Sequence, residues 1–379
     1  MAKEKEGTGF SLKDHLFNRQ RVQYLAGLFA SADSHFDSNA FVREAVKPFH
    51  DLELKQRIVH IAATLENHLP KDFPAACKCI VNALPPPLDP RRTDDDFGDF
   101  IFAPLGEFVV RNGLDRKMLR TSLRTLKEIT QRFSMEDAIR YFINAHTEPT
   151  MRELEKWARH KNYHVRRLVS EGTRPMLPWS GRIAIDVTGA LPLLDTLHAD
   201  STRYVTRSVA NHLNDISKSH PDVVVERLGS WKKMKQQDPV ELDWMCKHAT
   251  RTLIKQGDKG ALRLLGFRAR PRVEVNGFRL ESSKVKRGDY LAFSFDIKAA
   301  RSEPLIVDYI IDFLKADGST SPKVHKLKQV TIANGDSVRL KKRHKLHANA
   351  TTYTLYPGVH RVTLQINGKR FDTADFVVT

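Results

Sequence analysis

Three similar stretches of the chain read His164-Val-Arg-Arg-Leu-Val-Ser-Glu171, Tyr204-Val-Thr-Arg-Ser-Val-Ala-Asn211 and His248-Ala-Thr-Arg-Thr-Leu-Ile-Lys255. An arginine takes the fourth place in each, at Arg167, Arg207 and Arg251, so these arginines are 40 and 44 residues apart. This is the period of paired-helix solenoids, in which each repeat buries its apolar face only against its neighbours. The stretches therefore predict an all-α solenoid.

The same stretches predict a basic face on that solenoid. Residues four apart lie on one face of a helix, and the residues four positions after the arginines are Glu171, Asn211 and Lys255. The second stretch continues this pattern through Asp215, with Lys218 following. We therefore expect a stripe of positive charge along one side of the stack, interrupted by two acids, Glu171 and Asp215.

The overall composition predicts a polyanionic partner. The chain has 379 residues, which favours two domains. Its 62 Lys and Arg outnumber its 45 Asp and Glu and leave a net charge of +17. Such an excess is typical of proteins that bind nucleic acid, and less often of proteins that bind an anionic membrane surface.

Targeting signals and cysteines limit the alternatives. No run of about 18 apolar residues occurs, and the first residues, Met-Ala-Lys-Glu-Lys-Glu-Gly-Thr-Gly-Phe, lack the apolar core of a secretory signal. We expect a soluble, cytoplasmic protein without a membrane partner. Cys77, Cys79 and Cys246 include no second pair at zinc spacing, which favours buried or idle thiols over a disulfide framework or a structural metal.

The helical signal covers two segments. Apolar residues recur at helical spacing through residues 11–84 and again through residues 105–267. Between them, Pro85-Pro86-Pro87 and Asp94-Asp95-Asp96 predict a loop that continues to Pro104. The sequence Ser134-Met-Glu-Asp137 has the form of a capping box, which would begin a helix at that point.

From Arg270-Pro271 onward the period changes to that of strands. The alternating apolar runs are Leu291 to Ile297, Leu305 to Phe313 and Val362 to Ile366. The pairs Asn276-Gly277, Asp317-Gly318, Asn334-Gly335 and Asn367-Gly368 fall between runs and predict tight turns with positive φ. The sequence thus predicts a multi-domain protein, with a helical domain over residues 10–268 and a small antiparallel β-sandwich over residues 271–379.

Glu171 and Asp215 are the acids that need an explanation. A surface ion pair between Arg167 and Glu171, with the basic residue first, stabilises a helix by only about 0.3 to 0.5 kcal/mol. Asp215 falls near the end of its helix, before His220-Pro221, where the helix dipole disfavours a negative charge. Acids among phosphate-binding arginines also oppose binding. A functional role is therefore favoured over a solvated helix end, although structural ion-pair networks can produce a similar cluster.

The stretch His164–Trp179, together with Tyr204–Lys218, resembles the AlkC-type DNA alkylation repair glycosylases, which are HEAT-like repeat proteins related to AlkD. The run Ser-Glu-Gly-Thr-Arg-Pro-Met-Leu-Pro-Trp at 170–179 carries the resemblance, because generic helical repeats do not produce it. The similarity extends over residues 10–267. Some family members add an immunoglobulin-like domain, which residues 271–379 look like. The resemblance implies DNA base excision repair, by removal of N-alkylated bases from duplex DNA, 3-methyladenine foremost, without flipping them into a deep pocket.

The chemistry of that reaction gives the acids a task. Alkylation at a ring nitrogen makes the base cationic, so the base can leave without receiving a proton. The protein then has to stabilise the positive charge that grows on the deoxyribose and to position a water, and carboxylates suit both tasks. One charge pair at about 4 Å and an effective dielectric near 20 contributes about 4 kcal/mol, nearly a thousandfold in rate. With the resemblance, we assign Glu171 and Asp215 to these roles.

Two further residues join the catalytic candidates. Trp179 follows Pro178, and with Pro175 this proline should hold the backbone stiff. Its indole could stack on the sugar or on a cationic base, a contact worth about 0.5 to 2 kcal/mol. Trp157, Trp231 and Trp244 are instead expected in the core. Glu136 matches an acidic position of the family, but helix capping and the helix dipole already explain it, so it ranks below the other acids.

Basic residues along the repeats are expected to bind the DNA backbone. The candidates are Arg167, Arg174, Arg207, Lys218, Lys247, Arg251 and Lys255. Each phosphate contact would add about 0.9 to the salt dependence of binding. Lys341-Lys-Arg-His-Lys345 in the sandwich is a second candidate surface, but lysines at a strand edge also prevent aggregation, and the two explanations are equally good.

Other chemistries find little support in the sequence. It lacks a Gly-x-Gly-x-x-Gly opening a helix, a P-loop and a His-Glu-x-x-His zinc motif, and its histidines show no triad spacing. Asp94–Asp96 favours a solvated loop over a cation site. No lysine stands out as a lyase nucleophile. We expect a monofunctional, monomeric DNA glycosylase without metal, nucleotide or other cofactor, which leaves an abasic site. The alternative is a non-catalytic module that binds damaged DNA, or a protein scaffold.

Overall fold

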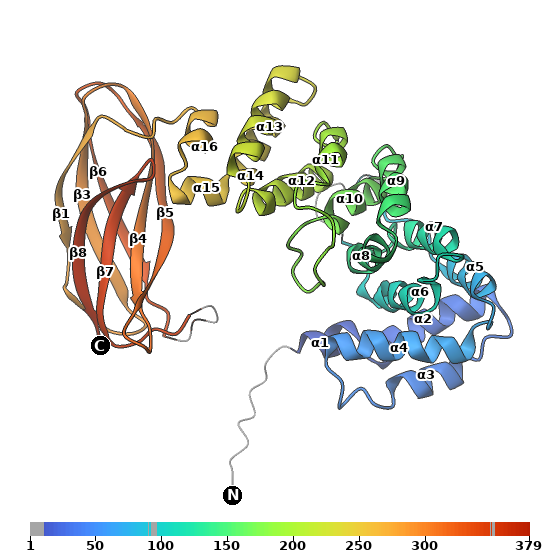
Figure 1. Cartoon of the computed structure of the whole chain (residues 1–379). Helices are drawn as coiled ribbons and strands as arrows, with labels where there is room; N and C mark the ends of the chain where they lie inside the picture. The colour runs from blue at the N-terminus through green and yellow to red at the C-terminus, as the bar shows by residue number, and fades with distance from the viewer. Residues whose placement is uncertain (1–10, 90, 92–96, 349, 351–352) are drawn as a thin grey trace, which may run out of the picture. The chain divides into compact units, whose positions relative to one another are not determined.

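The structure is a computed structural model that describes residues 11–89, 91, 97–348, 350 and 353–379 (Figure 1). Helices occupy the chain up to Leu264 and strands follow from Val273, which confirms the predicted fold class. The chain divides into two compact units, residues 1–216 with 236–241 (unit 1) and residues 217–235 with 242–379 (unit 2). The N-terminal residues 1–10 and Asp94–Asp96, which carried sequence-based expectations, lie outside the described residues.

Unit 1 is helical. Its elements are α1 (Leu12–Leu16), α2 (Arg19–Ala32), α3 (Ser38–Val46), α4 (Leu54–His68), α5 (Phe73–Ala83), the 3₁₀ turn η1 (Phe100–Phe102), α6 (Ala103–Gly113), α7 (Leu119–Ile129), α8 (Glu136–Ala145), α9 (Thr147–Trp157), α10 (Tyr163–Gly172), α11 (Leu191–Leu197) and α12 (Arg203–Ile216). The loop predicted from the prolines was expected to continue to Pro104, but it ends earlier, because η1 begins at Phe100 and Pro104 lies in the first turn of α6.

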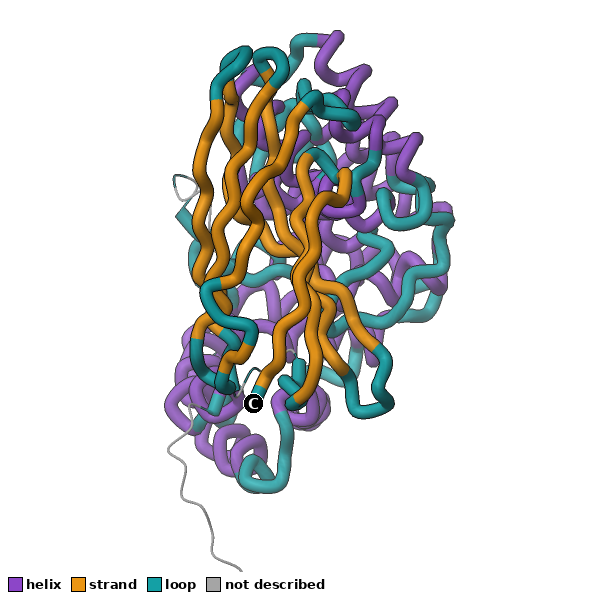
Figure 2. The backbone as a smooth tube through the Cα atoms, turned by 90° about the vertical axis from the view of Figure 1, so that its left-hand side faces the viewer, coloured by secondary structure: helices purple, strands orange, loops and turns teal. Residues whose placement is uncertain are grey.

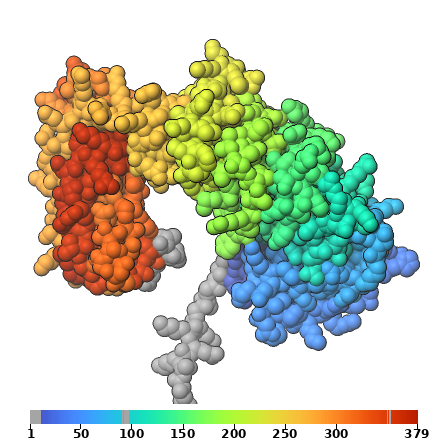
Figure 3. Space-filling view, viewed as in Figure 1, coloured from blue at the N-terminus to red at the C-terminus, as the bar shows by residue number. Residues whose placement is uncertain are grey.

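The helices of unit 1 pack as a repeat. Helices α4, α6, α8, α10 and α12 contact one another in succession and form one continuous layer. In the space-filling view, the colours of unit 1 pass from blue to green in chain order, as expected where each repeat packs on its neighbours (Figure 3). Glycine allows one of these approaches: a Cβ at Gly172 of α10 would lie 2.4 Å from Ile139 Cγ2 of α8.

The starts of α10 and α8 differ in their capping. Asn162 caps α10, because its side chain accepts a hydrogen bond from the backbone N–H of His164 at 2.8 Å. The capping box predicted at Ser134 is wrong, since α8 begins at Glu136 after Met135 and no side chain caps it. The Ser134 hydroxyl instead donates to the Glu136 carboxylate.

The third repeated stretch differs from the first two. Arg167 and Arg207 are the fifth residues of α10 and α12, whereas Arg251 begins a helix. The helix is interrupted at Thr250, between α14 and α15, and the Thr250 hydroxyl donates to the carbonyl of Cys246 at 2.7 Å. Arg251 also belongs to unit 2, while Arg167 and Arg207 belong to unit 1. Only Arg167 and Arg207 therefore occupy the same position in their helices, and Arg251 does not.

Unit 2 combines short helices with the predicted sandwich. The helices are α13 (Pro221–Met234), α14 (Pro239–Ala249, whose first residues belong to unit 1), α15 (Arg251–Gln256) and α16 (Lys259–Leu264). The strands are β1 (Val273–Leu280), β2 (Lys284–Val285), β3 (Tyr290–Ala299), β4 (Glu303–Leu314), β5 (Thr320–Ile332), β6 (Ser337–Lys345), β7 (Gly358–Ile366) and β8 (Lys369–Val378). They form two sheets, ordered β1-β3-β6 and β2-β8-β7-β4-β5 (Figure 2).

The core of the sandwich is built from the alternating residues. The inward side chains of β3 include Phe293, Phe295 and Ile297, and those of β4 include Tyr309 and Phe313, all of which are buried. Since successive residues of a strand face opposite sides, this alternation fixes the register of each strand. The predicted strand runs are thus confirmed.

Three of the four predicted turns are confirmed. Gly318, Gly335 and the pair Asn367-Gly368 have positive φ and connect β4 to β5, β5 to β6 and β7 to β8. The fourth, at Asn276-Gly277, is wrong: these residues lie inside β1, where the pairing with β3 shifts register between Asn276 and Arg279. A bulge with a positive-φ glycine has the same sequence signature as a tight turn.

The hairpin between β7 and β8 contacts the end of α15. A Cβ at Gly368 would lie 2.1 Å from the Cα of Gly257, so the two backbones touch. The side-chain amide of Gln365 donates to the carbonyl of Lys255 at 3.0 Å, and Asn367 donates to the carbonyl of Arg268 at 2.9 Å. These contacts attach the last helices to the sandwich within unit 2.

We predict that Gly368→Ala lowers the free energy of unfolding by about 3 kcal/mol or more, because it adds a backbone clash to the strain of a side chain at φ 75°. Gly318→Ala is the matched control, since Gly318 has φ 79° but open space around it; it should cost only about 1 to 2 kcal/mol. Urea unfolding measures both. Equal losses would contradict the contact between Gly257 and Gly368.

Candidate functional site

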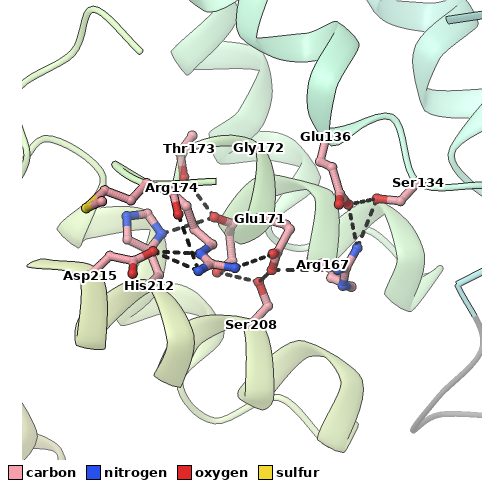
Figure 4. A network of polar contacts seen from close by, with 12 residues as sticks. Ser134, Glu136, Arg167, Glu171, Gly172, Thr173, Arg174, Ser208, His212 and Asp215 are labelled. Atoms are coloured by element: carbon pink, nitrogen blue, oxygen red, sulfur yellow. Dashed lines mark hydrogen bonds and ion pairs between the residues drawn. The ribbon is translucent and has the colours of Figure 1, made fainter. Parts of the chain in front are cut away.

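The centre of the candidate site is Arg174, which bridges two buried carboxylates (Figure 4). Its Nη1 donates to Glu171 Oε1 at 2.6 Å, while its Nε and Nη2 lie 2.9 and 2.8 Å from Asp215 Oδ2. The side chains of Glu171 and Asp215 are 6% and 5% exposed. Arg174 follows the end of α10 and Asp215 lies in the last turn of α12, so the bridge joins two neighbouring helices of the layer.

A second arginine continues the network on the other side of Glu171. Arg167 Nη2 lies 3.7 Å from Glu171 Oε2, and Arg167 Nη1 lies 2.8 Å from Glu136 Oε2 and 2.9 Å from Ser134 Oγ. The carboxylates of α8, α10 and α12 thus alternate with two guanidinium groups (Figure 4). The network therefore contains three carboxylates and two guanidinium groups.

Aromatic rings and hydroxyls complete its surroundings. The Arg167 guanidinium lies 4.5 Å from the ring centre of Tyr204 and 5.4 Å from that of Phe97, within the range of cation–π attraction. Ser208 of α12 donates to Glu171 Oε2 at 2.5 Å and lies 2.9 Å from the hydroxyl of Ser170. Each oxygen of Glu171 is therefore bound, which fixes the orientation of the carboxylate.

The arginines keep the network charged despite its burial. Burial raises the pKa of Glu171, but Arg167 and Arg174 outweigh it and hold the pKa below its ordinary value. Burial lowers the pKa of Arg167 and of Arg174, and the facing carboxylates more than reverse this effect in both. Glu171 is therefore ionised at neutral pH, in a dry setting where each ion pair is stronger than in water.

His212 lies next to this network as a neutral ring. It is completely buried, and its Nδ1 lies 3.0 Å from the carbonyl oxygen of Ser170. Burial, with the repulsion of Arg174, lowers its pKa to about 3. The neutral ring accordingly donates its Nδ1–H to Ser170. Its Nε2 has no hydrogen-bond partner among the described residues.

Trp179 has the opposite environment. Its side chain is 85% exposed, and its backbone has a φ of 72°, in the left-handed region that bulky residues avoid. Trp179 is therefore not a residue of the hydrophobic core. Trp157 and Trp231, which are 2% and 0% exposed, do belong to the core. Trp244 is half-buried and stacks on His248 with ring centres 4.9 Å apart.

Comparisons with known proteins cover the full length of the chain. The family model described as uncharacterised protein YhaZ, C-terminal Ig-like domain, matches residues 274–379. The uncharacterized protein YhaZ of Bacillus subtilis (strain 168) is 32% identical over 367 residues, which are 96% of this chain and 98% of that protein. The alkylpurine DNA glycosylase AlkC of Pseudomonas fluorescens, solved with DNA containing an abasic site analog, is 32% identical with a TM-score of 0.87, over 98% of this chain and 100% of that one.

The chain belongs to the AlkC family. The similarity includes both the helical part and the immunoglobulin-like sandwich, as the sequence led us to expect. Within this AlkC-family chain, the motif that carried the resemblance, residues 170–179, contributes Glu171, Arg174 and Trp179. The first two lie in the buried network and the third is exposed on the same segment.

Two of the predicted DNA ligands, Arg167 and Arg174, lie in the buried network and are paired with its acids. Arg167 is 6% exposed and faces Glu136 and Glu171, and the side chain of Arg174 is 11% exposed and faces Glu171 and Asp215. Contact of either with a phosphate would require breaking buried ion pairs, so both are better described as ligands of the acids. The surface ion pair considered for Arg167 and Glu171 is likewise wrong, because both residues are buried.

The other predicted DNA ligands of this AlkC-family chain lie nearer the surface. Arg207 is half-buried on α12 in unit 1. In unit 2, Lys218, Lys247 and Lys255 are exposed, and Arg251 is half-buried with Nη1 at 2.5 Å from the carbonyl of His248. Contacts of these five residues with DNA remain predictions.

The basic run of the sandwich alternates as a strand requires. It lies on β6, at the edge of the three-stranded sheet. Lys341, Arg343 and Lys345 are exposed, whereas Lys342 and His344 are half-buried. The Arg343 guanidinium lies 4.4 Å from the ring centre of Tyr290 on β3. Exposure agrees with both explanations offered for this run, DNA contact and protection of a strand edge.

The sequence reading missed several polar residues around the site. Ser208 and His212 are on α12, and Arg140 and Asn144 are on α8. Ser208 follows Arg207 directly, and the burial of a serine within a predicted helix gives no recognisable sequence signal. Glu136 carried a weak signal, but its pairing with Arg167 showed only in the structure.

The described residues hold no group of three His, Cys, Asp or Glu side chains arranged to bind a metal ion. Cys77 and Cys246 are buried and Cys79 is partly buried, all as free thiols, as expected. In the part of the chain that the structure describes, we also find no helix that is both long and apolar enough to cross a membrane.

The pKa of His212 predicts how stability depends on pH. Between pH 6.5 and 3 the unfolded chain protonates this histidine and the folded protein does not, so stability falls as pH falls through this window. From pH 6.5 to 5 the loss is about 2 kcal/mol. His325 and His344 have pKa values lowered to about 4 and add to the loss in any variant, so urea unfolding should show a loss about 2 kcal/mol larger in the wild type than in His212→Asn. Parallel pH dependences would mean that His212 titrates normally.

Proposed function

We propose that this chain is a monofunctional DNA glycosylase. It hydrolyses the N-glycosidic bond of cationic N-alkylated bases in duplex DNA, 3-methyladenine foremost, and leaves an abasic site. It acts as a cytoplasmic monomer without a cofactor and without flipping the base into a deep pocket. The observation that carries this proposal is the buried pairing of Glu171 and Asp215 through Arg174, in a chain similar over its whole length to an alkylpurine DNA glycosylase.

The buried carboxylates of the network suit a reaction that builds positive charge. As the bond to a cationic base breaks, charge moves from the base to the deoxyribose, and fixed carboxylates stabilise it without reorganising. Glu171 is held by Ser208 and by both arginines, so its carboxylate cannot turn away. We assign Glu171 and Asp215 to stabilisation of the sugar cation and to placement of the attacking water.

Among the catalytic candidates, the structure supports Glu136 more strongly than its sequence context did. Its side chain is 28% exposed, against 6% and 5% for Glu171 and Asp215, so it is the most accessible carboxylate of the network. Its partner is Arg167 rather than a helix cap. We propose that Glu136 contacts the substrate directly, together with the exposed indole of Trp179.

Arg167 and Arg174 have a structural task in this proposal. Carboxylates without partners would repel one another and would take up protons when buried, and the charged form would be lost. The two arginines prevent both. Removing one of them would leave buried negative charge uncompensated, which typically costs 3 to 5 kcal/mol of stability.

We predict that Glu171→Gln and Asp215→Asn each slow base release by about a hundredfold to a thousandfold. The amides keep the shape of the side chains but remove the charge, which contributes about 4 kcal/mol at 4 Å and an effective dielectric near 20. The measurement is single-turnover release of free base from methylated duplex DNA, separated by chromatography.

Glu155→Gln, at an exposed position of α9, is the control and should release base at the wild-type rate. Circular dichroism should show that all three variants are folded. Full activity of both site variants would remove the acids from the reaction. If the wild-type protein bound the DNA but released no base, the alternative of a non-catalytic damage-binding module would stand.

A separate prediction concerns the DNA backbone. Arg207→Ala should weaken binding and reduce the slope of log affinity against log salt by about 0.9, the amount expected for one lost phosphate contact. Arg152→Ala, which removes an exposed arginine paired with Glu148 on α9, should leave the slope unchanged. Fluorescence anisotropy of labelled duplex DNA at several salt concentrations gives both slopes. An unchanged slope for Arg207→Ala would exclude its phosphate contact.

A further inference from the structure

The segment that connects α10 to α11, residues 173–190, contains no helix or strand (Figure 1). Connections of this length inside a compact helical repeat are uncommon and are usually functional. The segment carries both Arg174, which binds the carboxylates, and the exposed Trp179. Anything that fixes this segment therefore fixes two parts of the candidate site.

Arg140 of α8 holds the segment by its backbone. This arginine is 2% exposed. Its Nη1 donates to the carbonyl oxygens of Gly172 at 3.1 Å and Arg174 at 2.8 Å, and its Nε donates to that of Gly181 at 3.0 Å. One buried guanidinium thus ties the start of the segment to residue 181 and closes a loop that contains Trp179.

Asn144 extends the same attachment. It lies one helical turn after Arg140 and on the same face of α8. Its Nδ2 donates to the carbonyl of Arg182 at 2.9 Å, and its Oδ1 accepts from the N–H of Ala184 at 2.8 Å. A single asparagine side chain therefore pairs with the backbone in the way a neighbouring strand would.

A third contact acts at the tryptophan itself. The ammonium group of Lys55 on α4 donates to the carbonyl oxygen of Trp179. The backbone there is in the left-handed region, which a bulky residue occupies only when its surroundings require it. Two helices of unit 1 thus hold the backbone on which an exposed indole stands.

We propose that Arg140, Asn144 and Lys55 are positioning residues: all three keep the Trp179 indole in place for the nucleic acid, and Arg140 also keeps the Arg174 guanidinium between the carboxylates of Glu171 and Asp215. The role of Trp179 as a contact rests on the proposed function. The attachment of the loop does not, and it can be measured without activity. None of the three residues touches the substrate in this proposal.

The first test is spectroscopic. Protein labelled with 5-fluorotryptophan gives four ¹⁹F resonances, since the chain has four tryptophans, and Trp179→Phe identifies the one from Trp179. Asn144→Ala and Lys55→Ala should each narrow this resonance, because the indole becomes more mobile, and leave those of the buried Trp157 and Trp231 unchanged. Asn112→Ala on α6 is the control, since it removes hydrogen bonds to Glu66 and Phe108, neither of which belongs to residues 173–190. An unchanged Trp179 resonance in both loop variants would overturn the proposal.

The second test is a double-mutant cycle on base release. Asn144→Ala should slow single-turnover release by about threefold to thirtyfold, the range expected for a lost stacking contact. In a Trp179→Ala background it should have no further effect, whereas a merely structural role would slow both backgrounds equally and would overturn the proposal. Arg140→Lys keeps the charge but loses the fork of donors. Because Arg140 also binds the carbonyl of Arg174, its effect on release should be reduced but not abolished in the Trp179→Ala background.

The two failures can be told apart. If the wild type released no base, the proposed function would fail while the ¹⁹F result would still decide whether the three residues hold the loop. If the wild type released base and the loop variants matched it in rate and in spectrum, the function would stand and the positioning role would fall.

Discussion

The site depends on one interaction, the bridge that Arg174 makes between the carboxylates of Glu171 and Asp215. Two buried negative charges on neighbouring helices repel each other, and burial raises the pKa of Glu171. The guanidinium of Arg174 between the two carboxylates offsets the repulsion, and with Arg167, which lies between Glu171 and Glu136, it holds the pKa of Glu171 below its ordinary value. Negative charge is thereby kept ionised in a dry layer of helices, where it acts on a cation more strongly than it would in water.

The packing of the helices makes this arrangement possible. The acids come from α8, α10 and α12, which are successive members of one layer, so side chains from different positions along these helices meet where the helices pack. Gly172 lets α10 approach α8 closely, and the hydroxyls of Ser170 and Ser208 meet where α10 packs on α12. The solenoid supplies the spacing, and the departures from an ordinary repeat, an acid in place of a solvated residue and an arginine just beyond a helix end, supply the chemistry.

Much of the fold could be predicted from the sequence, because periodicity reports it directly. The repeat of Arg167 and Arg207, the change of period at Arg270-Pro271 and the hairpin turns all follow from local rules. Several residues of the candidate site could be named from the sequence, but which of them form ion pairs with one another could not. From the sequence, Arg167 and Arg174 were predicted to bind phosphates. Only the fold shows that their guanidinium groups are paired with carboxylates. Residues such as Arg140 and His212 gave no signal, since their partners are backbone atoms 30 or more positions away.

The backbone at Trp179 sets stability against function. An L-residue with a large side chain at a φ of 72° is strained, whereas glycine would rest there without strain. An exposed indole also gains nothing from a hydrophobic interior. A search for more heat-resistant forms of this protein would therefore select the replacement of this tryptophan early. Screens that reward melting temperature alone would then enrich molecules that outlast the natural chain yet have lost the exposed indole that we propose as a DNA contact.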